Sequence, residues 1–355
     1  MNKRMYQFEL IRIVGMFMIV LHHVTVHGHY GENMGIYSFN IELFYPQALS
    51  IFGKVGVILY TMVSGYFLIE KQPQLKRLGP IIWPTLFYLS LGFILSVRGL
   101  WKMDALDLST FWEVLWNSYY PFSGYWFVNS YIVLYFFIPY INQVLITLEK
   151  KDFEKLLVKL LFILSIFFLL TTDYAPLGGL GNLLMGYTLG AYLKRFPLKL
   201  KTRQICFGLI GSIGLTVLFI YIADLFPPTK VGLLMRIINS PLIIAYDNSL
   251  MMVLIGFFAF LLLTRVQIKN SFIQNTLLIL GNSMFGVYLL HDNRVIGDRI
   301  MVYLAQFLQD TSVVIVPIII VLAIGLFVLC TVFESVRQYC AKRFFKIIGR
   351  KKFRS

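Results

Sequence analysis

The chain has 355 residues, of which 58% are hydrophobic and only 14% are charged, and its formal net charge is +15. Soluble domains carry roughly 25% charged residues, so this composition excludes an ordinary soluble protein and indicates that apolar surface faces lipid. The Lys and Arg residues lie in short clusters between apolar runs, which argues against a basic face for nucleic acid. Three cysteines without metal-ligand spacing predict neither a disulfide framework nor a metal site.

Long apolar runs predict an all-α integral membrane protein, a bundle of about ten transmembrane helices. A spanning helix needs about 20 mostly apolar residues. The segment between the fifth and sixth runs is short enough to predict a tight hairpin. We treat the chain as a single membrane domain (1–355) whose last residues, 336–355, form a basic cytoplasmic tail. The predicted spans are 8–26, 47–70, 79–98, 126–147, 156–173, 177–193, 204–225, 240–263, 276–296 and 313–335.

The basic residues also predict an orientation. With these spans, 24 of the 32 Lys and Arg residues lie on one side of the membrane. Basic residues are retained on the cytoplasmic side. We therefore expect a multi-pass protein of the cell membrane with both termini in the cytoplasm.

The first span carries ionisable residues where lipid would be expected. Arg12 and His23 are 11 residues apart, so they share a helix face and lie about 16 Å apart along the axis. Glu9 lies on that face too. Ionisable residues inside a span indicate function, and histidine is suited to proton exchange. Alternatively, Arg12 pairs with Glu9 near the inner head groups and His23 lies at the outer interface. His22 is rotated by about 100° and is the less favoured partner.

Two further regions are expected near the outer face. His291 and Arg294 end the ninth span one turn apart, at the level of His23. They form either an interfacial helix end or a second wall of one polar cavity. The aromatic run from Ser118 to Phe127 is either an interfacial belt or a binding platform, with Trp126 as the residue to test.

Two further spans contain groups of small residues, for which helix packing is one explanation. Ser64, Gly65 and Tyr66 on the second span serve either helix packing or contact with a ligand. On the sixth span, Gly178, Gly186 and Gly190 form a small-residue stripe with Asn182, which predicts helix packing.

Four motifs follow one another along the chain: an arginine, ten residues and a histidine on the first span; GVILYTMVSGYFL on the second; YWFVNSYIVLYFFIPYIN on the fourth; and MFGVYLLH on the ninth. Together they resemble the membrane acyltransferase-3 family of O-acyltransferases. The resemblance runs from about residue 6 to 335. The family often has paired arginines after the second span, whereas this chain has Lys71, Lys76 and Arg77.

The resemblance implies an enzyme that moves an acyl group, usually acetyl, from cytosolic acyl-coenzyme A to a hydroxyl of a cell-surface polysaccharide or lipid-linked glycan. Acyl-coenzyme A would be a co-substrate, with no tightly bound cofactor; the other expected partners are the glycan acceptor and the lipid bilayer. His23 would act as general base or form a transient acyl-histidine. The expected residues are His23, Arg12 and Glu9 for catalysis; Arg12, Lys76, Arg77, Ser64 and Tyr66 for the donor; and Trp126, His291 and Arg294 for the acceptor.

A transporter or flippase of a lipid-linked glycan is the alternative, because it also needs a polar cavity inside the membrane. Such proteins often contain internal repeats or broken helix pairs, and the sequence suggests neither. The two functions differ in one requirement, since a flippase does not depend on acyl-coenzyme A.

Overall fold

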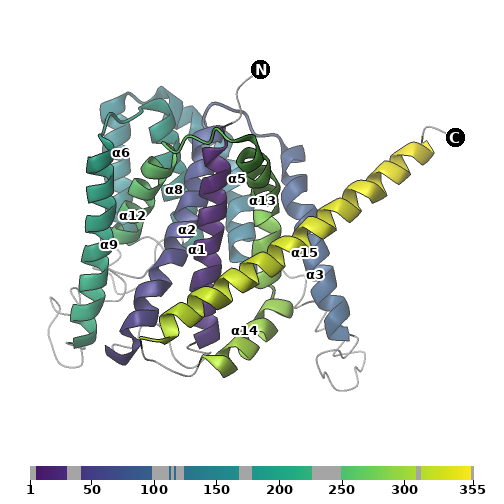
Figure 1. Cartoon of the computed structure of the whole chain (residues 1–355). Coiled ribbons are helices and arrows are strands. Elements are labelled where there is room, and N and C mark those ends of the chain that lie inside the picture. The colour runs from purple at the N-terminus through teal and green to yellow at the C-terminus, as the bar shows by residue number, and fades with distance from the viewer. Residues whose placement is uncertain are drawn as a thin grey trace.

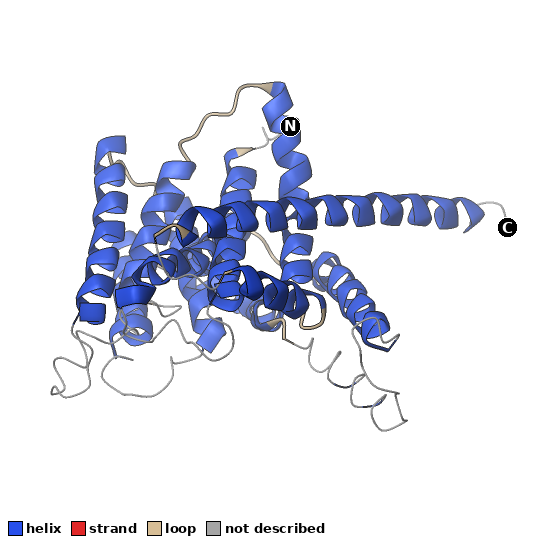
Figure 2. Ribbon diagram, turned by 60° about the horizontal axis from the view of Figure 1, so that its bottom comes forward, coloured by secondary structure: helices blue, strands red, loops and turns tan. Residues whose placement is uncertain are grey.

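The computed structural model describes residues 5–29, 41–97, 112, 116, 124–167, 178–225, 249–308 and 313–352. Within this part of the chain every regular element is a helix (Figure 2), so the predicted all-α class is confirmed. The hairpin predicted between the fifth and sixth spans and the beginning of the eighth span lie outside the described residues.

Seven helical segments in the described part are long and apolar enough to cross a membrane. They lie in α1 (Gln7–His29), α2 (Phe44–Leu68), α3 (Gly79–Val97), α5 (Trp126–Thr147), α9 (Thr202–Leu225), α13 (Ser271–His291) and α15 (Ile315–Lys352).

Shorter helices occupy the positions of the fifth, sixth and eighth predicted spans, so the count of about ten spans stays a prediction. These are α6 (Lys150–Leu161) with its π-helical continuation Phe162–Phe167, α8 (Gly178–Arg195) and α12 (Leu250–Leu263). The remaining elements are α14 (Ile296–Phe307) and two 3-10 turns, η1 (Ile41–Leu43) and η2 (Leu75–Leu78).

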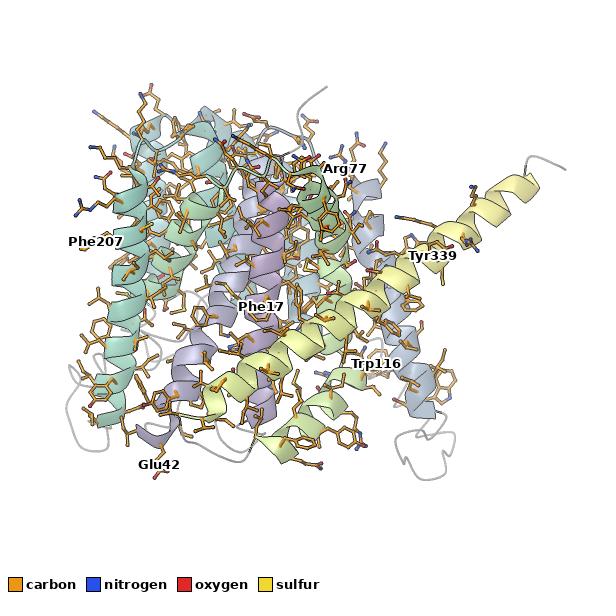
Figure 3. All side chains as sticks on the ribbon, viewed as in Figure 1. Phe17, Glu42, Arg77, Trp116, Phe207 and Tyr339 are labelled. Carbon is orange, nitrogen blue, oxygen red and sulfur yellow. The ribbon has the colours of Figure 1, made fainter. Side chains whose placement is uncertain are left out.

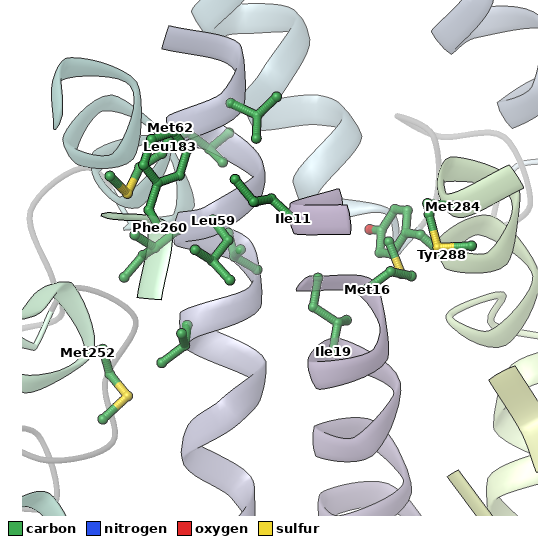
Figure 4. Close-up of a cluster of buried hydrophobic side chains, with 14 of the residues drawn as sticks. Ile11, Met16, Ile19, Leu59, Met62, Leu183, Met252, Phe260, Met284 and Tyr288 are labelled. Carbon is green, nitrogen blue, oxygen red and sulfur yellow. The ribbon is translucent and has the colours of Figure 1, made fainter. Parts of the chain in front are cut away.

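The centre of the bundle is the contact between α1 and α2. A Cβ atom on Gly56 of α2 would lie 2.4 Å from the carbonyl oxygen of Gly15 of α1, so the two backbones touch there and only glycine fits. Figure 4 shows Ile11 and Ile19 of α1 beside Leu59 of α2 in the buried cluster. This close packing holds the polar residues of α1 in fixed positions.

Helix α8 packs against the other side of α2 through part of the predicted small-residue stripe. A Cβ atom on Gly190 would lie 2.0 Å from the carbonyl oxygen of Met62, and Gly186 meets Thr61 in the same way. Packing is therefore the role of these two glycines. Gly178 does not take part, because no atom lies within 4 Å of the position of its Cβ.

The ninth span ends earlier than predicted, and part of the predicted external loop is helical. Helix α13 stops at His291, and α14 occupies much of 297–312. The side chain of Asn293 accepts hydrogen bonds from the backbone N–H groups of Val295 and Ile296, which satisfies donors at the start of α14. Gly28 then lies close to Leu304 of α14, so α14 covers the end of α1.

Helix α15 continues past its predicted end at residue 335. It runs to Lys352 through the predicted basic tail, where Lys, Arg and Gln are good helix formers. It crosses the bundle obliquely (Figure 1), and its C-terminal part extends beyond the other helices (Figure 2). Both termini lie on the same side of the bundle in Figure 1. Figure 3 shows Arg77 near that side and Glu42 at the opposite end. That the terminal side is cytoplasmic stays a prediction.

Candidate active site

Helix α1 presents several histidines at the end away from the termini. The ring of His23 lies 5.5 Å from that of His22 and 5.4 Å from that of His27. Helix α13 adds His291, whose ring lies 5.0 Å from that of His23. The structure thus brings together His23 and His291, the two residues that the sequence placed at the same depth on different spans.

Asp292, which the sequence analysis did not select, lies against His23. Its Oδ1 is 3.5 Å from Nδ1 of His23, and both side chains are largely shielded from solvent. That distance is at the outer limit of a hydrogen bond, and no closer partner for Nδ1 occurs in the described part of the chain. Catalytic hydrogen bonds are often long without substrate. A carboxylate at Nδ1 favours the tautomer whose lone pair is on Nε2.

The tautomer of His291 follows from its own hydrogen bond. Its Nδ1 lies 2.7 Å from the carbonyl oxygen of Val287. A carbonyl only accepts, so Nδ1 carries the proton and Nε2 of the neutral ring keeps a lone pair. This Nε2 is buried and has no hydrogen-bond partner among the described residues. His291 therefore keeps an unused hydrogen-bond acceptor close to the ring of His23.

His23 lines a cavity of about 320 Å³, which we call the histidine cavity. Its wall combines residues from α1, α2, α5 and α13 and is mostly apolar. Polar groups in the wall are His22, His23, Lys54, Tyr60 and Tyr288. An apolar pocket with a few convergent polar groups is the usual form of a small-molecule site.

The two other residues predicted to bind the acceptor lie on either side of this region. Trp126 lines the histidine cavity, packs over Gly179 and is 37% exposed, so it forms the rim. Arg294 is exposed and packs against Gly124, which adopts a φ of +84°. Arg294 follows the turn that carries Asp292, but it is not part of the cavity wall.

Glu9 and Arg12 form the ion pair that the alternative interpretation predicts. Nη1 of Arg12 lies 2.9 Å from Oε2 of Glu9, and Glu9 is buried against Gly281 of α13. Arg12 does not line the histidine cavity. Tyr60 lies between the two regions, because it lines the cavity and is within electrostatic range of Arg12. Arg12 and His23, which the sequence placed on one helix face, are therefore not joined within the histidine cavity.

The predicted donor residues on α2 serve packing in this structure. Ser64 donates to the carbonyl oxygen of Tyr60 and accepts from the hydroxyl of Tyr131. The ring of Tyr66 lies 4.7 Å from that of Phe8, and Lys194 lies over it. Lys76 and Arg77, in contrast, are exposed in η2 at the terminal side of the bundle.

Sequence reasoning missed the residues that fix the turn after His291. Asn293 is buried and donates to the hydroxyl of Tyr125 and to the carbonyl oxygen of Tyr88. These partners hold the turn, and hence Asp292, against α3 and α5. The sequence offered a partial signal for Asp292, because this residue directly follows His291, which the sequence analysis selected.

The family model described as an acyltransferase domain matches residues 5–333. The match covers nearly the whole chain. The chain belongs to the acyltransferase-3 family. No curated protein and no solved structure matches the chain. The acyltransferase assignment therefore rests on the family match, and the histidine cavity is where the structure gathers residues able to carry out acyl transfer.

Proposed function

We propose that this membrane acyltransferase moves an acyl group, with acetyl as the expected case, from cytosolic acyl-coenzyme A to a hydroxyl of a cell-surface or lipid-linked glycan. One observation carries the proposal: His23 lies in a cavity with Asp292 at its Nδ1 and the unpartnered Nε2 of His291 nearby. A base oriented by a third group is the arrangement that activates a nucleophile.

The direct mechanism uses His23 as the general base. Nε2 of His23 takes the proton of the acceptor hydroxyl while the hydroxyl oxygen attacks the thioester carbonyl carbon. The carbon–sulfur bond then breaks, and the departing thiolate takes the proton back from Nε2. Asp292 stabilises the imidazolium that exists between these steps. The products are the acylated glycan and free coenzyme A, and no other reactant is required.

The covalent mechanism begins with the same ring. Nε2 of His23 attacks the thioester carbonyl carbon and the coenzyme A thiolate leaves; the oxygen of the acceptor hydroxyl then attacks the acyl carbon, its bond to Nε2 breaks, and the hydroxyl proton passes to the thiolate. Purified enzyme mixed with labelled acyl-coenzyme A without an acceptor distinguishes the two. A burst of released coenzyme A with label on the protein indicates acyl-histidine, and its absence indicates direct transfer.

We assign the acceptor to the rim of the histidine cavity and the donor to the side of the bundle that carries the termini. Trp126 offers a ring face to a sugar, and the lone pair on Nε2 of His291 accepts from a sugar hydroxyl. Arg294 is available to an anionic substituent of the glycan. Lys76 and Arg77, with Arg12 nearby along α1, would meet the phosphates of the donor.

The test uses purified protein in proteoliposomes with labelled acetyl-coenzyme A and candidate glycans. The proposal expects label on the glycan with wild type and little with His23→Ala, while both bind coenzyme A. A flippase would instead translocate the glycan without acyl-coenzyme A, and that result would replace the proposal with the alternative function.

A further inference from the structure

A second cavity lies between α3, α13 and α15, on the side of the bundle that carries the termini. Its volume is about 640 Å³, twice that of the histidine cavity. We call it the α15 cavity. Its wall includes Pro80 of α3, Asn282 and Phe285 of α13, and Gln338 and Lys342 of α15.

Phe285 belongs to the walls of both cavities. Helix geometry explains this position. At 3.6 residues per turn, Tyr288 points to the α1 side of α13, Asn282 and Gly286 point to the α15 side, and Phe285 lies between the two sectors. One partly buried aromatic side chain therefore forms a common wall of the histidine cavity and the α15 cavity.

Asn282 gives the wall of the α15 cavity a polar group. Its side chain is exposed on α13, level with Gln338 of α15, whose Nε2 donates to the backbone carbonyl oxygen of Asn282. Its donor and acceptor groups are suited to an amide-containing chain.

One basic residue of this cavity wall is free to meet a ligand, and two more lie close to the wall along the chain. Lys342 is exposed in its wall. Pro80 lies close behind Lys76 and Arg77 along the chain, since η2 leads directly into α3. Arg337 is also in the wall, but both its Nε and Nη2 are bound by Glu334, so its charge is already neutralised.

We propose that the α15 cavity is the entry site of the acyl donor, which rests on the proposed function. The phosphates of acyl-coenzyme A would lie at Lys342 and the η2 basic residues, and the pantetheine amides would lie beside Asn282. The acyl thioester would pass Phe285 to reach His23. Phe285 is then a positioning residue that separates the donor from water until its acyl end is in place.

The first test fills the cavity. Ala341→Trp adds bulk to its wall, whereas Val336→Trp on the same helix adds it to a 56% exposed position outside the wall. The expected result is that Ala341→Trp raises KM for acyl-coenzyme A by about tenfold or more with little change in KM for the acceptor, and that Val336→Trp leaves both unchanged. Equal effects of the two substitutions, or none, would overturn the assignment.

The second test removes the positive charge of Lys342 and has a control on the same helix. Lys342→Gln should raise KM for acyl-coenzyme A about threefold to tenfold, with an effect that shrinks in high salt. Arg343→Gln removes the same charge next to it, but Arg343 lies over the ring of Tyr339 and outside the wall, so KM should stay unchanged. A similar rise in both variants would show general attraction to a basic helix instead of a site.

A labelling experiment does not depend on activity. In a Cys340→Ser background, the thiol of Ala341→Cys is labelled with a membrane-impermeant maleimide, with and without desulfo-coenzyme A. Protection is expected, and Val336→Cys should show none. If wild type transfers acyl groups but desulfo-coenzyme A gives no protection, only the entry site is wrong. If wild type neither binds nor uses acyl-coenzyme A, the proposed function itself fails. Protection by added lipid alone would assign the cavity to a lipid and overturn the donor assignment.

Discussion

The ionisable groups at the two cavities differ in how fully they are hydrogen-bonded. In the α15 cavity, Glu334 is 2% exposed and accepts hydrogen bonds from Tyr88, from two nitrogens of Arg337 and from Gln338. Beside the histidine cavity, the buried Nε2 of His291 has no partner within the described chain, and in the cavity wall Nδ1 of His23 has only the long contact with Asp292. Glu334 therefore ties helices together, whereas the two histidines keep capacity for a ligand.

This difference in hydrogen bonding gives the two sets of residues different roles: the Glu334 network is structural, and the histidines are available for chemistry. The Glu334 network joins α15 to α3 through Tyr88, and Gln338 joins it to α13 through the carbonyl oxygen of Asn282. It fixes the wall of a cavity that is open toward the terminal side. The histidine pair at the other end has the freedom that proton transfer requires.

The largest effect is expected at His23. His23→Ala should lower kcat for acyl transfer by about 10²- to 10⁴-fold, because the general base is removed, while coenzyme A binding is retained. Transfer of labelled acetyl groups and a separate binding measurement check this. His22→Gln is the control, since His22 is held by the carbonyl oxygen of Ser50 and should affect transfer far less. Equal losses in the two variants would contradict the role of His23.

The Glu334 network should respond in stability more than in chemistry. Arg337→Leu leaves the buried carboxylate of Glu334 without its ion pair and should destabilise the fold by about 3 kcal/mol. Tyr88→Phe removes a single hydrogen bond and should cost about 1 kcal/mol. Thermal unfolding in detergent should rank the midpoints in that order. An Arg337→Leu protein as stable as wild type would show that this network does not hold α15.

Asp292 is expected to act through His23. Asp292→Asn should lower kcat by about 10- to 50-fold with little change in KM for the donor, because the imidazole loses orientation and the imidazolium loses its countercharge. Asp298→Asn, an exposed carboxyl on α14, is the control. The pair should also be non-additive: once His23 is replaced by Ala, the change at Asp292 should have little further effect. If the losses in kcat from the two substitutions multiply in the double variant, Asp292 does not act through His23.

The smallest effect concerns the ion pair on α1. If Arg12 attracts the donor phosphates, Arg12→Ala should raise KM for acyl-coenzyme A about threefold. Glu9→Gln, which releases the guanidinium from its partner, should lower KM slightly. A steady-state series at low salt measures both. If the two variants shift KM in the same direction, the pair serves packing against Gly281 and not the donor.

The sequence predicted the parts of the molecule that depend on neighbours along the chain. The fourth predicted span, 126–147, coincides with α5, and the helical face shared by Glu9 and Arg12 is present as their ion pair. Helix α14 was missed because it has only 12 residues and carries Asp298 and Arg299 in its first turn, so it does not resemble a span.

Contacts between distant segments could not be read in the same way. Tyr88 and Glu334 are 246 residues apart, and nothing in either span specifies that they meet. The spacing of Glu334 and Arg337 was a usable signal, but Arg337 was counted only as part of a basic tail. Asp292 was likewise not selected, since only the packing of α13 against α1 places it at His23.

The proposed mechanism requires that the acyl group pass from one side of the membrane to the other. The direct measurement seals the protein in vesicles with the C-terminal helix outward, supplies labelled acetyl-coenzyme A only outside, and encloses the glycan. We predict label on the enclosed glycan, and none with His23→Ala. Label that appears only when donor and glycan share the same side would contradict a path from the α15 cavity past Phe285 to His23.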